Sequence, residues 1–361
     1  MRTTKVGKYD VFYPDEIGFA FNPSMIKVVG NEQDVFTFGV NIPLSEGQQM
    51  LTFRSFGGTA IADVSLFVQE AFRHDGVADN MQYDEANASK RGKAISFELT
   101  LDGERFTFET FFVWGALEMG GKDIFNAPRK LDYFKGYPFS WGVYVQEPIT
   151  LQVQVDGERT QTIALNGESM YEVPLSFDGG NSALIGEDTG KIVETTFTDV
   201  FGNTFSKAYA PLIERATINI HEECQDDECV YLRWVDGHGF YRYYLFGKSS
   251  ENITASGGEY QRNDFRLWDD KLGYGYNAGR MQNFQRGKTL NLYAALLDDD
   301  RWKGLSTIGT SPIVEMYCGK IDGKNTWMSV AVQGATYARS KEELQDFEVT
   351  IELPTTQMQG L

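Results

Sequence analysis

Apolar and polar residues alternate with a period of two along much of this 361-residue chain, and turn residues interrupt the alternation at short intervals. Successive side chains of a β-strand point to opposite faces, so this pattern predicts strands. Residues 95–114 and 149–165 each read as a hairpin, because Asp102-Gly103 and Asp156-Gly157 supply the positive-φ residues of a type I′ turn. Abundant Phe and Tyr favour aromatic-rich strands. We therefore expect a mainly β protein.

Few helices are expected, and they are short. Residues 62–76 carry apolar side chains at the spacing of one buried helix face, with Asp63 as the N-cap. A second short helix is expected to start near Asp298. It would bury three side chains at a three-residue spacing, namely Trp302, Leu305 and Ile308. The string SKEE at 340–343 matches a capping box and predicts one or two further turns.

The chain is too long for one small core, so two or three domains are expected. The Gly-, Asn- and Ser-rich segment 176–190 and the turn-rich stretch 207–215 are the linker candidates. We divide the chain into an N-terminal β-sandwich-like domain with one helix, a small β domain or insertion, and a C-terminal β domain with an aromatic hairpin and a short helix. These domains are residues 1–148, 149–212 and 213–361. The predicted fold class is several β-sandwich-like domains with a few short helices packed on sheets.

Charge and composition exclude several classes of partner. The net charge is −18, and the basic residues are scattered, which argues against nucleic-acid binding. No window approaches the ~20 apolar residues of a membrane helix, so membrane insertion is not expected. The N-terminal residues contain no apolar stretch of signal-peptide length. Three cysteines do not suggest a disulfide framework, and we expect synthesis in a reducing cytoplasm.

No motif in the chain points to catalysis, a cofactor or a metal. His221, Glu222, Cys224 and Cys229 include metal-ligand types, but C-x₄-C without a second pair is not a structural zinc pattern. The four residues between Cys224 and Cys229 are mostly acidic, which is typical of a solvated hairpin tip. The glycine-rich segment 273–279 lacks the strand and helix of a nucleotide fingerprint. With three histidines in the chain, a histidine-dependent triad is not expected either. A glycoside hydrolase or other β-rich enzyme stays open as a third hypothesis, because 51 Asp and Glu residues guarantee some close carboxylate pairs, but nothing singles one out. We predict a protein that is not an enzyme.

The aromatic segment CVYLRWVDGHGFYRYYLF, residues 229–246, predicts two strands, 229–235 and 240–246, joined by a turn at Asp236–Gly239. Neither strand has a polar face. Such strands are covered on both sides, by a second layer of their own domain or by a neighbouring subunit. His238 is interpreted as a turn residue. The interface or binding candidates are Tyr231, Trp234, Tyr241, Tyr243, Tyr244 and Phe246, together with Trp268 further along the chain.

This hairpin, read with the C-terminal third, resembles tail and baseplate structural proteins, of the distal-tail type, from phages and prophages that infect Bacteroidetes. The resemblance rests on YLRWVDGHGFYRYYLF (231–246), DDDRWKGLSTIGTSPIVEMY (298–317) and TYARSKEELQDFEVTIELP (336–354). Shorter similarities lie at 19–30, 59–73 and 135–145. The matches are scattered over about two thirds of the chain, and 149–212 has none.

The resemblance implies a virion component of a phage tail or baseplate, assembled in the host cytoplasm from β-sandwich domains. The expected partners are other copies of the chain, in a ring-like homo-oligomer, and other tail proteins. Head–tail connector and capsid-decoration roles remain open beside the tail role. The family has no catalytic residues to carry over. The alternative function is a carbohydrate-binding or receptor-recognition module, in which aromatic rings stack on a host glycan.

Overall fold

The computed structural model describes residues 1–44, 47–75, 81, 83–117, 128–209, 211–222, 228–263, 277–334, 337–339 and 342–357. Strands make up 62% of the chain, against about 20–25% in an average globular protein. The prediction of a mainly β fold with several sheets and short helices is therefore confirmed. The chain divides into two compact units, Met1–Glu223 with Val235–Arg242, and Cys224–Trp234 with Tyr243–Leu361. The boundary expected after residue 148 lies inside the first unit, and the one expected after 212 lies within a strand of that unit.

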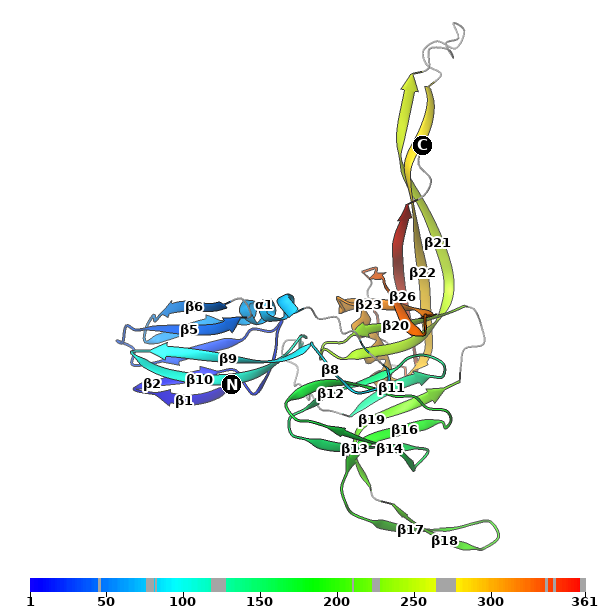
Figure 1. The fold of residues 1–361 in the computed structure, drawn as a ribbon, viewed down its shortest axis with the longest axis horizontal. Helices are drawn as coiled ribbons and strands as arrows, with labels where there is room; N and C mark the ends of the chain where they lie inside the picture. Colours follow the sequence, from blue (N-terminus) through cyan, green and yellow to red (C-terminus); the bar gives the residue numbers. More distant parts are fainter. Residues whose placement is uncertain are drawn as a thin grey trace. The chain divides into compact units, whose positions relative to one another are not determined.

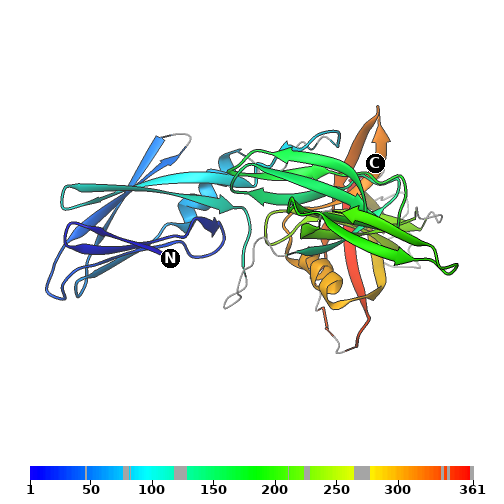
Figure 2. The ribbon, with the colours of Figure 1, turned by 90° about the horizontal axis from the view of Figure 1, so that it is seen from below.

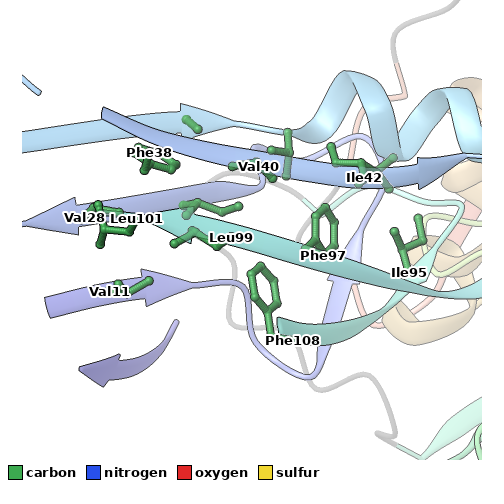
Figure 3. Close-up of a cluster of buried hydrophobic side chains, with 14 of the residues drawn as sticks. Val11, Val28, Phe38, Val40, Ile42, Ile95, Phe97, Leu99, Leu101 and Phe108 are labelled. Carbon is green, nitrogen blue, oxygen red and sulfur yellow. The ribbon is translucent and has the colours of Figure 1, made fainter. Parts of the chain in front are cut away.

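The first part of unit 1 is a sandwich of two sheets (Figures 1 and 2, blue and cyan). One sheet has the order β1-β2-β4-β7, with β1 Arg2–Val6, β2 Tyr9–Tyr13, β4 Met25–Val29 and β7 Thr59–Asp63. The other has the order β3-β10-β9-β5-β6, with β3 Ile17–Phe19, β10 Glu104–Val113, β9 Gly92–Leu101, β5 Thr37–Leu44 and β6 Gly47–Arg54. Alternate residues of the two sheets form one hydrophobic core, in which Val11 and Val28 lie with Phe38 and Leu99 (Figure 3).

The predicted hairpin turn and helix of this sandwich are present, but the helix begins at Ser65, and Asp63, the expected N-cap, is the last residue of β7. Asp102 and Gly103 have φ angles of 48° and 86°, as the β9–β10 hairpin turn requires. The helix α1, Ser65–Asp75, packs its apolar stripe against the sandwich core through residues such as Val68 and Phe72. The carboxylate of Asp63 accepts the N–H of Ser65 at 3.0 Å and so satisfies a free donor at the start of the helix.

The second part of unit 1 contains a five-stranded and a three-stranded sheet. The first has the order β11-β19-β16-β13-β14, with β11 Arg129–Phe134, β19 Leu212–His221, β16 Ser182–Asp188, β13 Ile149–Val155 and β14 Glu158–Leu165. The second has the order β12-β15-β8, with β12 Ser140–Val145, β15 Ser169–Pro174 and β8 Asn87–Ala88. The β13–β14 turn has Asp156 and Gly157 at φ 47° and 83°, as predicted. The linker predicted at 176–190 was wrong, because β16 is a central strand of the five-stranded sheet.

A separate two-stranded hairpin extends from this five-stranded sheet (Figure 1). It consists of β17, Val193–Thr198, and β18, Thr204–Tyr209, which pair only with each other. The hairpin interrupts the connection between β16 and β19, which are themselves antiparallel neighbours up to the pair Asp188↔Leu212. We call residues 190–210 the arm.

Unit 2 is built on one seven-stranded sheet of order β24-β23-β20-β21-β22-β26-β25. Its strands are β20 Cys229–Val235, β21 Tyr241–Asn263, β22 Asn277–Leu297, β23 Val314–Ile321, β24 Lys324–Ser329, β25 Ala331–Val332 and β26 Gln345–Gln357. The ends of the β20–β21 hairpin, at residues 235 and 241–242, are assigned to unit 1.

The second predicted helix is confirmed as α2, Asp299–Ser306, followed by the 3₁₀ turn η2, Thr307–Thr310 (Figure 2, gold). Asp298 is its N-cap and accepts the N–H of Arg301 at 2.9 Å. The three side chains expected to be buried, Trp302, Leu305 and Ile308, are all buried. The turns expected after SKEE are not helical where described: Glu342–Leu344 form a bend, and residues 340–341 lie outside the described residues. No described helix is long and apolar enough to span a membrane.

Candidate assembly surface

The aromatic segment forms the predicted pair of strands, β20 and the start of β21, joined by the turn at 236–240. Six of the seven candidate residues lie in it, and each is at most 7% exposed in the single chain. They are Tyr231, Trp234, Tyr241, Tyr243, Tyr244 and Phe246. Both faces of the hairpin are therefore covered within the chain, and these side chains are not available to a partner in this conformation. The seventh candidate, Trp268, lies outside the described residues.

Trp234 is one of the largest fully buried side chains of the chain. Its indole N–H donates to the hydroxyl of Thr307 at 2.9 Å, so the polar atom of the ring has a partner. The ring lies 6.4 Å from that of Phe246, which in turn lies 6.4 Å from Phe347 on β26. The residue therefore acts as a packing and hydrogen-bonding anchor of the fold.

The opposite face of the hairpin packs into an aromatic cluster that the sequence pattern did not reveal. Tyr231 lies 6.0 Å from both Tyr243 and Trp327, and Trp327 lies 5.1 Å from Tyr317. The guanidinium of Arg233 lies 4.2 Å from the centre of the Trp327 ring and donates to Glu315 at 2.7 Å. A sugar stacks on an open ring face, and here the Arg233 guanidinium occupies a face of Trp327. Alternation alone could not identify Tyr317 and Trp327, because β23 and β24 are distant from the hairpin in sequence.

The turn of the hairpin is held by a buried carboxylate. Asp236 accepts the N–H groups of His238 and Phe240 at 2.9 and 3.1 Å and the Nε–H of Arg242 at 3.0 Å. Burial raises the pKa of Asp236, but the charges of Arg242 and Arg129 outweigh this effect and lower the pKa below its ordinary value. His238 is a residue of this turn, as expected.

A buried ion pair fixes the same turn to the strands of unit 1, and no local sequence pattern predicts this pair. Arg91 donates to Glu172 at 2.8 Å and to the carbonyl oxygen of Gly239 at 2.6 Å. Glu172 also accepts the N–H of Tyr241 at 2.9 Å and the hydroxyl of Ser140 at 2.7 Å. Both charged side chains are almost completely buried. Buried charges are tolerated when they are paired and hydrogen-bonded, so this network has a structural explanation.

Where the structure describes them, the residues of metal-ligand type interact with other side chains of the chain or form a disulfide. The Nε2 atom of His221 lies 2.7 Å from a carboxylate oxygen of Asp132, and Glu222 pairs with Lys135. Cys229 forms a disulfide, which the cysteine count did not lead us to expect, and Cys318 is free and exposed. Cys224 and residues 273–276 lie outside the described residues. Within the described ranges, no group of three or more His, Cys, Asp or Glu side chains could hold a metal ion.

Several of the exposed large apolar side chains are on the arm. Val200 and Phe201, at the tip of the β17–β18 hairpin, are 95% and 87% exposed. Ile192, at the base, is also exposed. Val193 and Phe205 are exposed too, and the register places them on one face of the hairpin. Threonine, serine and glutamate occupy most of the other face, so the hairpin is amphipathic without a core of its own among the described residues.

A second exposed element is the outer part of the β21–β22–β26 ribbon, which Figure 1 shows as a long extension of unit 2. Residues 249–258 of β21 are exposed without interruption, as are 354–357 of β26. Because neighbouring residues of a strand point to opposite faces, such runs mean that both faces of the ribbon are open. The exposed runs of the ribbon are mostly polar, with Ile253 as an exposed apolar residue. The strands are paired through rows such as Ala255↔Arg286↔Thr356.

Comparisons with known proteins do not assign a family. No protein-family model and no curated protein matches the chain. One solved structure, described as "Structural insight into host cell surface retention of a 1.5-MDa bacterial ice-binding adhesin", aligns with 94% of this chain and 82% of that chain at 10% identity. The TM-score of that alignment is 0.15, which establishes no common fold.

Proposed function

We propose that this chain is a virion structural protein of a phage tail or baseplate that works through subunit–subunit assembly. The observation that supports assembly is the pair of β elements exposed on both faces, the arm and the outer β21–β22–β26 ribbon. The assignment to a virion rests on the sequence resemblance of the aromatic hairpin and the C-terminal third.

Elements of this kind cost free energy when they are ordered alone. A two-stranded hairpin is at best marginally stable in water, because it buries too little apolar area to offset the lost chain entropy. The arm has two strands, and the outer ribbon has three strands with no covering layer along the exposed runs. Contact with another subunit supplies the missing cover. Extended elements therefore suit a protein that functions within an assembly.

The compact parts of the chain serve this role as a scaffold. The aromatic hairpin, the Arg91–Glu172 pair and the sandwich core are buried within the chain. The arm extends from the sheet that contains β16 and β19, and the ribbon continues strands of the seven-stranded sheet. Repeated contacts between identical subunits close into rings when the rotation between neighbours closes. The partners in this proposal are other copies in a ring-like homo-oligomer and other tail proteins.

Two experiments test the proposal. Negative-stain electron microscopy of the purified chain is expected to show rings or other closed oligomers of uniform size. Mass spectrometry of density-purified phage particles, produced by a host that carries the gene, is expected to detect the chain in stoichiometric amounts. Particles that lack the chain would contradict the virion role even if the purified protein assembles.

The glycan-binding alternative has weaker support. Recognition of a sugar by stacking requires an exposed aromatic ring face. The six described aromatic candidates are buried, which leaves Trp268 as the residue on which this alternative depends. Glycan-dependent quenching of tryptophan fluorescence that Trp268→Ala abolishes would favour it over the assembly proposal.

A further inference from the structure

The arm is an addition to the fold and contributes nothing to the sheet from which it extends. The strands β16 and β19 pair from Ser182↔Asn219 to Asp188↔Leu212, and the hydroxyl of Thr189 then donates to the carbonyl oxygen of Pro211 at 3.0 Å. A short turn would be sufficient to connect two strands that end side by side. The chain instead inserts 21 residues, 190–210, whose two six-residue strands reach about 20 Å.

The tip of the arm carries apolar side chains where turns ordinarily carry polar ones. Val200 and Phe201 are the central residues of the turn between Asp199 and Asn203, and they are almost fully exposed. Two adjacent large hydrophobic residues on a turn gain nothing from the fold of this chain. Exposing these two side chains to water is unfavourable, and a partner that covers them would recover that free energy.

Hydrogen bonds fix the conformation of the same tip in the structure. The carboxylate of Asp199 accepts the backbone N–H groups of Phe201 and Asn203 at 2.9 and 2.8 Å and the side-chain amide of Asn203 at 2.9 Å. The turn is closed by backbone bonds between Asp199 and Asn203 and from Gly202 to Asp199, and Gly202 has the positive φ of 85° that the turn needs. The side-chain amide and backbone N–H of Asn203 also lower the pKa of Asp199, so the carboxylate stays charged at neutral pH. A preorganised tip loses little conformational entropy on docking.

The charge of the arm indicates which partner it fits. Lys191 and Lys207 balance Glu194 and Asp199, so the arm has a net charge of zero in a chain whose net charge is −18. Two copies of so acidic a chain repel one another, and a neutral arm is a region through which they can meet without like-charge contact. Anionic lipid requires a cationic or strongly basic surface, which this arm does not offer.

We infer that the arm is the docking element of self-assembly, and that its Val200–Phe201 tip inserts into an apolar site on a second copy of this chain. The inference rests on the proposed function and names the contact through which it operates. When this contact is made from each copy to the next rather than exchanged within a pair, it is heterologous, and it closes into a ring if the rotation between neighbours closes.

The test compares four forms of the full chain by sedimentation equilibrium. Replacing residues 190–210 with Asn-Gly removes the arm and joins Thr189 to Pro211 through a two-residue turn. Phe201→Asp adds a charge at the tip, and Thr196→Asp adds the same charge to the exposed polar face of the arm as the matched control. Circular dichroism and thermal melting check that each form keeps the β fold of the unmodified chain.

The expected result is that the unmodified chain and Thr196→Asp self-associate equally, while Phe201→Asp and the arm deletion weaken association at least about tenfold. Unchanged association of the well-folded arm deletion would overturn this inference and leave the proposed assembly function standing. A strictly monomeric unmodified chain would overturn both. Co-flotation of the unmodified chain with phosphatidylcholine or phosphatidylglycerol vesicles, lost on deletion of the arm, would overturn the assignment of a second copy as the partner.

Discussion

Arg91 and Glu172 form a buried ion pair with 2.8 Å between the guanidinium and the carboxylate, and together they hold the turn of the aromatic hairpin. Arg91 binds the carbonyl oxygen of Gly239, and Glu172 binds the N–H of Tyr241. The guanidinium also lies 4.1 Å from the centre of the Tyr241 ring. Each charged group therefore has a partner of opposite charge and a backbone partner in the same turn.

Removal of one member of this pair is expected to be strongly destabilising. Arg91→Met leaves the carboxylate of Glu172 buried without its counter-charge, and breaking such a pair costs about 3–5 kcal/mol. The double variant Arg91→Met/Glu172→Met removes both charges and should recover part of the loss. Urea titration measures the free energy of unfolding of each form. A cost below about 0.5 kcal/mol for the single variant would mean that the pair does not hold the turn.

Asp236 should make the stability of the chain sensitive to acid. Its pKa in the folded protein is lowered below the ordinary value of 3.8, because the charges of Arg242 and Arg129 outweigh burial. The folded state therefore binds the proton less well than the unfolded state, and this stabilisation is present above the unfolded pKa. It is lost as the pH falls through the folded pKa. Asp236→Asn should be less stable at pH 7 and should lose less stability between pH 7 and pH 3, measured by thermal melting.

Substitution of Trp234 tests whether the aromatic hairpin belongs to the hydrophobic core of the fold. Trp234→Ala removes a fully buried ring and should cost about 3–5 kcal/mol of unfolding free energy. Trp234→Phe keeps most of the ring volume but leaves the hydroxyl of Thr307 without the indole donor, and should cost about 1–2 kcal/mol. Chemical denaturation followed by circular dichroism measures both. If Trp234→Ala keeps full stability and only blocks association, the residue belongs to an interface after all.

Substitution of Asp199 tests whether the hydrogen bonds that order the arm tip matter for association, separately from its apolar side chains. Asp199→Ala removes the acceptor for three hydrogen bonds at the turn but leaves Val200 and Phe201 in place. The loosened tip has more entropy to lose on docking, so association should weaken by about tenfold. Thr196→Ala, on the polar face of the arm, is the control and should associate like the unmodified chain. Equal association of Asp199→Ala and the unmodified chain would show that tip order is irrelevant.

Local patterns in the sequence were sufficient to predict much of the fold. The Asp-Gly turns, the stripe of α1 and the cap of α2 are short-range signals, in which a residue and its partner lie within a few positions. The strands of the aromatic hairpin were identified in the same way, by alternation around a Gly-containing turn.

Long-range pairing could not be read from the same patterns. Arg91 and Glu172 are 81 positions apart, and no local rule connects a single arginine with a single glutamate. The segment 176–190 has linker composition, yet its neighbours in space make β16 a central strand. The absence of a polar face on the aromatic hairpin indicated that both sides are covered, but not that this chain supplies the cover itself. The arm was missed because its amphipathic strands look like any other hairpin until their lack of a covering layer is seen.

Sedimentation velocity over a wide range of protein concentration measures whether the unmodified chain assembles. We expect a shift from monomer to one discrete oligomer as concentration rises, and no such shift when residues 190–210 are replaced by Asn-Gly. A single monomeric species at every concentration would contradict the proposed assembly.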